Sequence, residues 1–207
     1  MPLKAIRTDT KEAVYIFDHI QPKYDLRGLF GRDGVLVCPD VECNSKLTVV
    51  QGEIVTQHFR HIDSNAGCYF SNESIEHVIA KEALMVKARE MWPEAVVECE
   101  MYIKIDGEKR FIDVAVTFEE YGLALEAQIS NQGIKEYERR TAEYRRYGYE
   151  TVWFNGSHNK HAENWCKSNC ISYGSLSFKT ESSHLFDTVY TKRINKGNAK
   201  PHHKSNR

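Results

Sequence analysis

The sequence predicts an α/β protein with a mixed sheet, built in the order helix, three strands, helix, strand. An amphipathic pattern that starts in a Ser-rich stretch and stops before a proline predicts a helix over residues 71–92. Three stretches of alternating apolar residues within 96–130 are typical of strands. A polar, Arg- and Tyr-rich stretch between Gly133 and Gly148 predicts the second helix, and ETVWF at 150–154 predicts the last strand.

The composition is that of one globular domain with a small appendage. Of 207 residues, 41% are hydrophobic and 28% are charged, which is ordinary for a soluble protein. No apolar run approaches the length of a membrane span, and MPLKAIRTDT lacks the apolar core of a signal peptide. We therefore expect a cytoplasmic protein with no membrane contact, whose six cysteines are reduced.

The patterns divide the chain into an N-terminal subdomain at 1–70, a core domain at 71–187 and a tail at 188–207. The N-terminal part holds short β-like pieces, AVYIF and GVLVC, separated by a turn-rich stretch. The tail holds six Lys and Arg residues, no acid and no apolar periodicity, which predicts disorder. Such a tail either binds a phosphate backbone, with Lys192 and Arg193 among the contacts, or is only solvated.

Cysteines and histidines in CPDVEC, QHFRH and the residues after them predict a zinc site. Cys38, Cys43, His58, His61 and Cys68 offer five ligands to an ion that takes four. An extended QHFRH would point its two histidines to opposite sides. We therefore prefer Cys38, Cys43, His61 and Cys68, with His58 as the alternative ligand or as a residue that faces DNA. Such a closed site would be structural; buried free thiols are the alternative interpretation.

RFIDVAVTF and LALEAQIS predict a hairpin with one apolar and one polar face. A turn that is symmetric about Glu120 and Tyr121 pairs Phe118 with Leu123, Val116 with Leu125, Val114 with Ala127 and Ile112 with Ile129. The same register places Asp113 opposite Gln128, on the face that also carries Glu126. A carboxylate pair and an amide would therefore lie together, among small neighbours.

Asp113 and Glu126 predict a divalent-metal site. Two carboxylates a few ångströms apart repel each other unless a cation lies between them. Their hard oxygens suit Mg²⁺ or Mn²⁺, and such an ion could polarise a phosphodiester and activate water. The alternative interpretation is an antiparallel sheet with one solvated face.

The first predicted helix carries further candidates. Glu73, His77 and Lys81 are spaced by four residues, so they share one helix face, and Glu76 flanks them. His77 could transfer protons or orient water, and Lys81 could neutralise phosphate charge. Taken alone, the spacing equally fits ordinary ion pairs on a helix surface.

In order along the chain, CPDVEC, HFRH, ESIEHVIAK, RFIDVAV, LEAQIS and YERRTAEYRRYGYETVWF resemble the competence protein CoiA-like nucleases. These belong to the PD-(D/E)xK nuclease superfamily, and the resemblance covers roughly residues 35–155. It implies a restriction-endonuclease-like αβββαβ core behind a zinc-binding β subdomain. The cysteine knuckle departs from the family pattern, because it is C-x4-C rather than C-x2-C.

The resemblance also implies roles for individual residues. Asp113 and Glu126 would bind the catalytic Mg²⁺ or Mn²⁺, with the carbonyl of Ala127 as a further ligand. Gln128 stands where the superfamily usually has a lysine, so Lys81 or Arg140 would replace its charge. The remaining assignments are metal binding through water by Glu73 or Glu76, a phosphate contact by Arg140, and nucleic-acid contact or packing by Tyr144.

The sequence thus predicts a metal-dependent DNA nuclease with a D…ExQ site, a structural zinc and DNA as its partner. The alternative is a catalytically degenerate module of the same fold that binds DNA or a partner protein, which the missing lysine favours. A homodimer is compatible with either. A zinc-based transcriptional regulator fits less well, because the sequence has no helix-turn-helix or tandem-finger pattern.

Overall fold

The computed structural model describes residues 1–19, 30, 35–50, 57–63, 67–71, 73–156 and 159–176. The basic tail, with Lys192 and Arg193, lies outside these residues, so its predicted disorder stays a prediction. Within the described ranges, no helix is long and apolar enough to cross a membrane.

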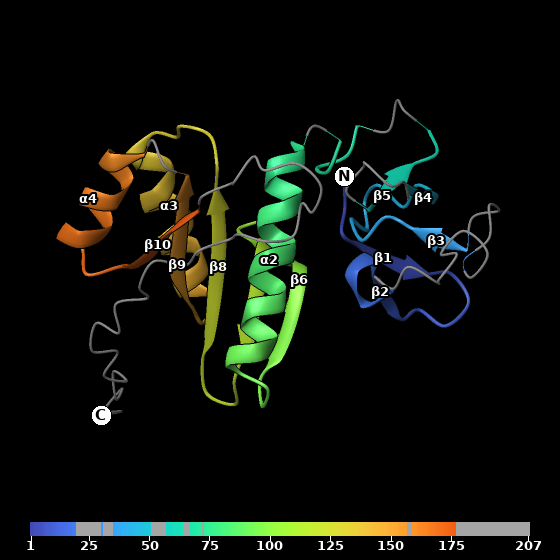
Figure 1. The fold of residues 1–207 in the computed structure, drawn as a ribbon, viewed down its shortest axis with the longest axis horizontal. Coiled ribbons are helices and arrows are strands. Elements are labelled where there is room, and N and C mark those ends of the chain that lie inside the picture. The colour runs from blue at the N-terminus through green and yellow to red at the C-terminus, as the bar shows by residue number, and fades with distance from the viewer. Residues whose placement is uncertain are drawn as a thin grey trace, which may run out of the picture.

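A five-stranded mixed sheet forms the centre of the molecule (Figure 1). Its strands are β6 (Val96–Ile105), β7 (Glu108–Thr117), β8 (Gly122–Gln128), β9 (Tyr149–Gly156) and β10 (Ser172–Leu176), in the spatial order β10-β9-β8-β7-β6. The first three strands are antiparallel, and β8, β9 and β10 are parallel. The predicted succession of elements is confirmed, and β10 extends it.

Three helices pack against this sheet: α2 (Ile75–Met91), α3 (Ile134–Arg146) and α4 (Lys160–Ser168). Helix α2 lies on one face, where Val78 and Leu84 join a cluster with Val114 and Leu125. Helix α3 lies on the other face, where Tyr144 packs with small sheet residues. The predicted site face of β7 and β8 therefore looks toward α3, while the N-terminal end of α2 approaches it from the opposite side.

The N-terminal residues form two small sheets (Figure 1). The first has the order β2-β1-β3 and consists of β1 (Lys4–Arg7), β2 (Ala13–Tyr15) and β3 (Leu36–Val37), with the short 3-10 helix η1 (Ile16–His19) after β2. The second pairs β4 (Leu47–Val50) with β5 (His58–His61). The prediction of a β-rich N-terminal part is confirmed.

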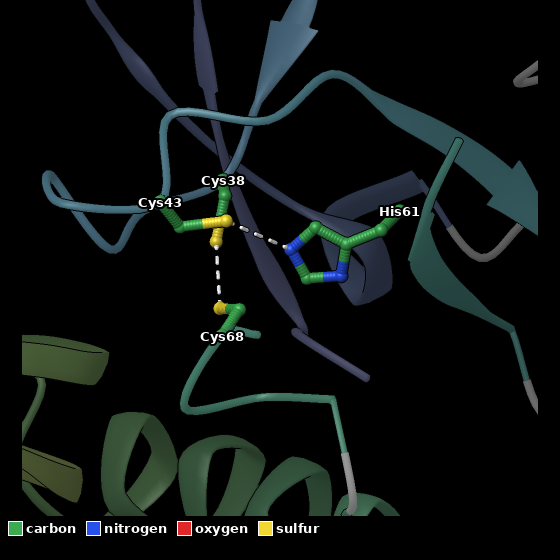
Figure 2. Close-up of side chains that lie close together, drawn as sticks. All are labelled: Cys38, Cys43, His61 and Cys68. Carbon is green, nitrogen blue, oxygen red and sulfur yellow. Dashed lines mark hydrogen bonds between the residues drawn. The ribbon is translucent and has the colours of Figure 1, made fainter. Parts of the chain in front are cut away.

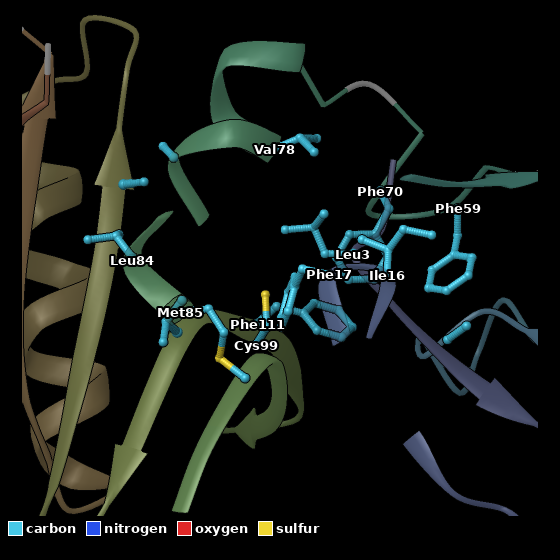
Figure 3. Close-up of a cluster of buried hydrophobic side chains, with 14 of the residues drawn as sticks. Leu3, Ile16, Phe17, Phe59, Phe70, Val78, Leu84, Met85, Cys99 and Phe111 are labelled. Atoms are coloured by element: carbon cyan, nitrogen blue, oxygen red, sulfur yellow. The ribbon is translucent and has the colours of Figure 1, made fainter. Parts of the chain in front are cut away.

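One hydrophobic cluster runs from the N-terminal sheets into the core (Figure 3). Leu3 and Phe59 belong to it on one side, Met85 of α2 and Phe111 of β7 on the other, and Phe70 lies between them. The ring centroids of Phe70 and Phe111 are 4.8 Å apart. Because this cluster crosses residue 70, the N-terminal part is packed onto the core; the proposed boundary at that residue stays a prediction.

The predicted register of the β7–β8 hairpin is wrong by two residues. Val116 pairs with Leu123 and Val114 with Leu125, because the turn is shorter than expected. The N–H of Phe118 donates to the carbonyl of Tyr121 at 2.9 Å, so the turn is centred one residue earlier. A shift of two preserves the alternation of side chains, so Val114, Val116, Leu125 and Ala127 stay on their predicted common face. The prediction that Ile112 shares this face is wrong, because Ile112 packs with Ala115 and Tyr144 on the other side of the sheet.

Candidate functional site

Asp113 and Glu126 lie where the β7–β8 ladder ends. The last backbone pair is Val114 with Leu125. Beyond it, the N–H of Asp113 donates to Oε1 of Glu126 at 3.4 Å, and the N–H of Ala127 donates to Oδ2 of Asp113 at 2.8 Å. Each carboxylate thus accepts a hydrogen bond from the neighbouring strand, which fixes the two acids beside each other.

The two acids differ in their ionisation. Glu126 is fully buried, and burial, helped by the charge of Asp113, raises its pKa to about 8 despite the opposing charge of Arg140. Burial would also raise the pKa of Asp113, but the charge and hydrogen bond of His77, with Arg140, lower it to about 2. At neutral pH the pair therefore favours one proton, and only an added cation would keep both acids charged.

His77 reaches this pair from the N-terminal end of α2. Its Nε2 lies 3.1 Å from Oδ2 of Asp113 and its Nδ1 lies 2.8 Å from Oε1 of Glu73. Burial opposes the charged imidazole, but the two carboxylates prevail and raise the pKa of His77 to about 10. With both ring nitrogens donating, His77 holds Asp113 in place.

Lys81, one turn further along α2, belongs to a buried cluster of charges. Its Nζ lies 2.6 Å from Glu73 and also contacts Glu100, and the side chain is 1% exposed. Glu100 accepts hydrogen bonds from the N–H groups of Leu3 and Lys4 at 2.9 and 3.1 Å. Lys81 and Glu100 therefore fasten β1 to the sheet.

Sequence reasoning missed Glu100. The alternation in VVECEMYIKI predicts that it shares the solvated face with Glu98. Its backbone φ of 54° interrupts the regular strand geometry, however. Its side chain therefore points toward α2, on the same side of the sheet as the side chain of Cys99. The pairing of β6 with β7 keeps one register on both sides of Glu100, so no residue is inserted, and no pattern in the sequence signals this local irregularity.

Arg140 projects from α3 onto the same pair of acids. Its guanidinium forms an ion pair with Glu126 and donates to the hydroxyl of Tyr144 at 3.0 Å. Its Cζ lies 5.2 Å from the centre of the Trp153 ring, within the range of a cation–π contact. The tyrosine and tryptophan thus hold Arg140 against Glu126.

Two other predicted residues lie at the margin. Gln128 is nearly buried, and its Nε2 donates to the carbonyl and hydroxyl oxygens of Ser130 at 2.9 and 3.2 Å. Glu76 is exposed on α2. The residues that the structure brings together are therefore Asp113, Glu126, His77 and Arg140, with Glu73 behind His77.

The carboxylate pair fits a Mg²⁺ or Mn²⁺ ion by its chemistry. Asp113 and Glu126 supply hard oxygen donors from adjacent strands, and such ions take one or two carboxylates with water or phosphate oxygens for the rest. Burial raises the pKa of Glu126 even with Arg140 present, so a cation bound between the acids would favour its charged form. A cation held here would replace that arginine as the partner of Glu126.

Cys38, Cys43, His61 and Cys68 form a second candidate metal site (Figure 2). Their ligand atoms all lie within 4.8 Å of one another. The two sulfur atoms of Cys38 and Cys68 are 3.5 Å apart, and Sγ of Cys43 lies 3.5 Å from Nε2 of His61. Ligands at ~2.3 Å around a tetrahedral Zn²⁺ would be about 3.7 Å apart, which matches this arrangement.

The geometry agrees with the predicted choice of histidine. Among the described residues, the group that could hold a metal contains His61, while His58 is buried at the opposite end of β5. Burial also lowers the pKa of His61, which favours the neutral imidazole that metal ligands use.

Two contacts join this cluster to the core domain. Asp40, fully buried within CPDVEC, accepts a hydrogen bond from Nζ of Lys109 on β7 at 2.8 Å. Cys68 begins a turn in which Ser71 N–H donates to its carbonyl at 3.0 Å. The next residue, Tyr69, packs on Phe111 with 4.7 Å between ring centres. Burial raises the pKa of the Tyr69 hydroxyl to about 12, and the charge of Asp113 adds to this shift.

The family model described as the nuclease-like domain of competence protein CoiA matches residues 73–199. No curated protein matches the chain. Among solved structures, the chain is similar to the protein of unknown function AF1548, with 14% sequence identity and a TM-score of 0.38. The match covers 49% of this chain and 60% of AF1548, so this chain spans less than two thirds of the length of that protein.

Two further structures resemble the chain at a similar level. A fdxN element excision controlling factor protein from Anabaena variabilis is 11% identical, with a TM-score of 0.32 over 47% of this chain and 91% of its own. An XisH family protein from Nostoc punctiforme PCC 73102 is 11% identical, with a TM-score of 0.33, and the match covers 50% of this chain and 91% of that protein.

Proposed function

This chain belongs to the family of competence protein CoiA nuclease-like domains, and we propose that it is a divalent-metal-dependent DNA nuclease. The observation that carries the proposal is the buried pair of Asp113 and Glu126 at the end of the β7–β8 ladder, where Glu126 accepts a hydrogen bond from the N–H of Asp113 and Asp113 accepts one from the N–H of Ala127. A pair of acids kept this close has a physical use when a cation lies between them.

The chain's own residues would prepare the site in complementary ways. His77 keeps Asp113 ionised and oriented, so that one strong oxygen ligand is ready at neutral pH. Glu126 becomes the second ligand when it gives up its proton. A bound Mg²⁺ or Mn²⁺ would polarise the phosphodiester and lower the pKa of the attacking water.

Arg140 is the residue that we assign to the role of the missing lysine. The amide of Gln128 carries no charge, and Lys81 is buried between Glu73 and Glu100. Arg140, by contrast, already lies against Glu126. Once Glu126 turns to a metal ion, the guanidinium is free to hold a phosphate oxygen of the substrate.

The zinc cluster has a structural role in this proposal. Its four ligands come from the loop after β3, from β5 and from the turn before α2, so a bound Zn²⁺ would close these segments around one point. It holds no position open for substrate, which separates it from the catalytic pair.

Cleavage assays test the proposed function. Plasmid, linear duplex and single-stranded DNA are incubated with Mg²⁺ or Mn²⁺ and wild type, Asp113→Ala or Glu126→Ala. We expect wild-type cleavage and a loss on the order of 10²–10³-fold or more in each variant, as for removal of a preorganised electrostatic contact. Glu120→Ala, in the exposed turn at the other end of the same strands, is the control that should match wild type. Cleavage that persists in both site variants would refute the proposal.

A second candidate function is DNA or protein binding without catalysis. Gln128 in place of a lysine, and an arginine already paired with Glu126, are the observations that favour it. It predicts binding of DNA with no turnover in either metal, so the same assay, with binding measured alongside, separates the two.

A further inference from the structure

We propose that Tyr69 is a substrate-contact residue, whose ring stacks on an unpaired base of the nucleic acid next to the bond that is cut. This inference rests on the proposed function and deepens it, since it names the form of substrate that the site prefers: a strand whose bases are unpaired near the scissile phosphate.

The first support is that Tyr69 keeps half of its surface in solvent although it lies within an aromatic cluster. It is 50% exposed, whereas its neighbours Phe70 and Phe111 are buried. Its ring lies 4.7 Å from that of Phe111 at an interplanar angle of 37°, so Phe111 supports one side of it. A supported ring with a solvated side is the arrangement on which bases stack in proteins that bind single strands.

The second support is its position relative to the acids. Phe111 lies two residues before Asp113 on β7, and its carbonyl accepts a hydrogen bond from Tyr144, the residue that holds Arg140. Tyr69 therefore packs on a side chain from the stretch of β7 that carries Asp113, one of the two acids.

The third support is the rigidity of the turn that presents it. Cys68 is one of the four clustered metal ligands, and its N–H donates to the hydroxyl of Ser71 at 3.1 Å. The N–H of Phe70 points to Sγ of Cys68 at 3.5 Å. Zinc at this cluster would thus fix the residue directly before Tyr69, and the zinc centre becomes a device that positions a substrate contact.

A packing role for Tyr69 predicts something different. The buried space between the N-terminal sheets and the core is filled by Phe70 and Phe111, whose rings contact each other directly. Truncation of a half-exposed ring beside them should change the stability of the protein little. Nucleic-acid affinity is the property that separates the two roles.

Binding of a fluorescein-labelled single-stranded oligonucleotide, measured by anisotropy with Ca²⁺ in place of Mg²⁺, tests the inference on the zinc-loaded protein. We expect Tyr69→Ala to weaken binding by about 5- to 100-fold, as loss of one base stack does, and Tyr69→Phe to bind like wild type. Tyr121→Ala is the matched control. It removes a tyrosine that is 54% exposed and stacked on Phe118, at the opposite end of the hairpin.

Two comparisons complete the design. A fully paired duplex should lose less affinity than the single strand in Tyr69→Ala, because its bases stay stacked on one another. Zinc removal should weaken single-strand binding in wild type, and much less in Tyr69→Ala, whose contact is already gone. Circular dichroism and thermal unfolding confirm that each protein stays folded.

The outcomes separate the two proposals. If wild type binds and cleaves DNA while Tyr69→Ala behaves like Tyr121→Ala, the role of Tyr69 is overturned and the nuclease stands. If Tyr69→Phe binds the single strand as weakly as Tyr69→Ala does, the hydroxyl makes the contact and the stacking proposal is wrong. If wild type neither binds nor cleaves, both proposals fail.

Discussion

Burial raises the pKa of three glutamates among the described residues, and their surroundings differ: Glu100 is paired with Lys81, Glu126 lies in the candidate site, and Glu82 has no charge partner in this shift. Glu126 has Asp113 and Arg140 as charged neighbours and accepts a hydrogen bond from the N–H of Asp113, and its pKa is about 8. Glu82 is nearly buried on α2, and burial is the one cause that raises its pKa to about 7. Glu126 is perturbed together with a second acid and a cation, a combination that is frequent at functional sites, whereas burial alone accounts for the shift of Glu82.

Glu82 gives a pH-dependent stability prediction. The folded state keeps its proton up to about pH 7, whereas the unfolded chain releases it near its ordinary value, so the free energy of unfolding falls as pH rises between them. Glu82→Gln should therefore raise the free energy of unfolding at pH 8 by about 1–3 kcal/mol and change it little at pH 4.

Urea denaturation of zinc-loaded protein at both pH values checks this. Glu76→Gln, on the exposed side of the same helix, serves as the control. An equal effect of Glu82→Gln at pH 4 and pH 8 would contradict the prediction.

At the scale of elements, the positions of the strands and helices in the core domain could be predicted from the sequence, but the exact pairing of the strands could not. Alternation of apolar residues places β6 at 96–105, where the structure has it, because this pattern is a local property of the sequence. The burial itself does not alternate throughout, since the adjacent Cys99 and Glu100 are both buried. The register of β7 and β8 depends on one turn, and the sequence pattern centres that turn one position too late. The small sheets of the N-terminal part are predicted only in part, since β1 and β3 pair through residues that are distant in the chain.

Helix α3 offers a prediction at its two ends. Gly133 is its N-cap, with extended backbone, no side-chain cap and open space where a Cβ would lie. Gly133→Ser should supply the missing acceptor and stabilise the protein by about 0.5–1 kcal/mol. Gly148, just beyond the other end, has φ of +90°, so Gly148→Ser should destabilise it by about 1 kcal/mol or more.

Thermal unfolding of both variants beside wild type measures these shifts. The two substitutions are chemically identical, so a difference in sign reports the backbone alone. A destabilising Gly133→Ser would show that the cap is already satisfied.

At the scale of the whole molecule, the site depends on contacts between the N-terminal part and the core. The family resemblance indicates Asp113, Glu126, Cys38, Cys43 and the histidines of HFRH, because these lie in short motifs, while Cys68 and the preference for His61 follow from the ligand count and strand alternation. It does not indicate Glu100, Asp40 or Tyr69, each of which gains its partner across the junction. Such partners depend on packing between segments far apart in sequence, which a motif does not encode.

Lys81 tests this junction. Lys81→Met leaves Glu73 and Glu100 buried without their shared cation, so we expect a loss of about 3–5 kcal/mol in the free energy of unfolding. Lys87→Met removes an exposed ion pair from the same helix and should cost less than about 1 kcal/mol. Chemical denaturation of the three proteins makes the comparison, and equal losses would show that the buried cluster holds nothing together.

The most direct test of the account is Mn²⁺ binding to the zinc-loaded protein, followed by electron paramagnetic resonance of the free ion. We predict that wild type removes Mn²⁺ from solution at one site, and that Glu126→Gln, which keeps the shape of the side chain but not its charge, binds it at least ~10-fold more weakly. Equal binding by both proteins would place the metal elsewhere and contradict the assignment of Asp113 and Glu126 as its ligands.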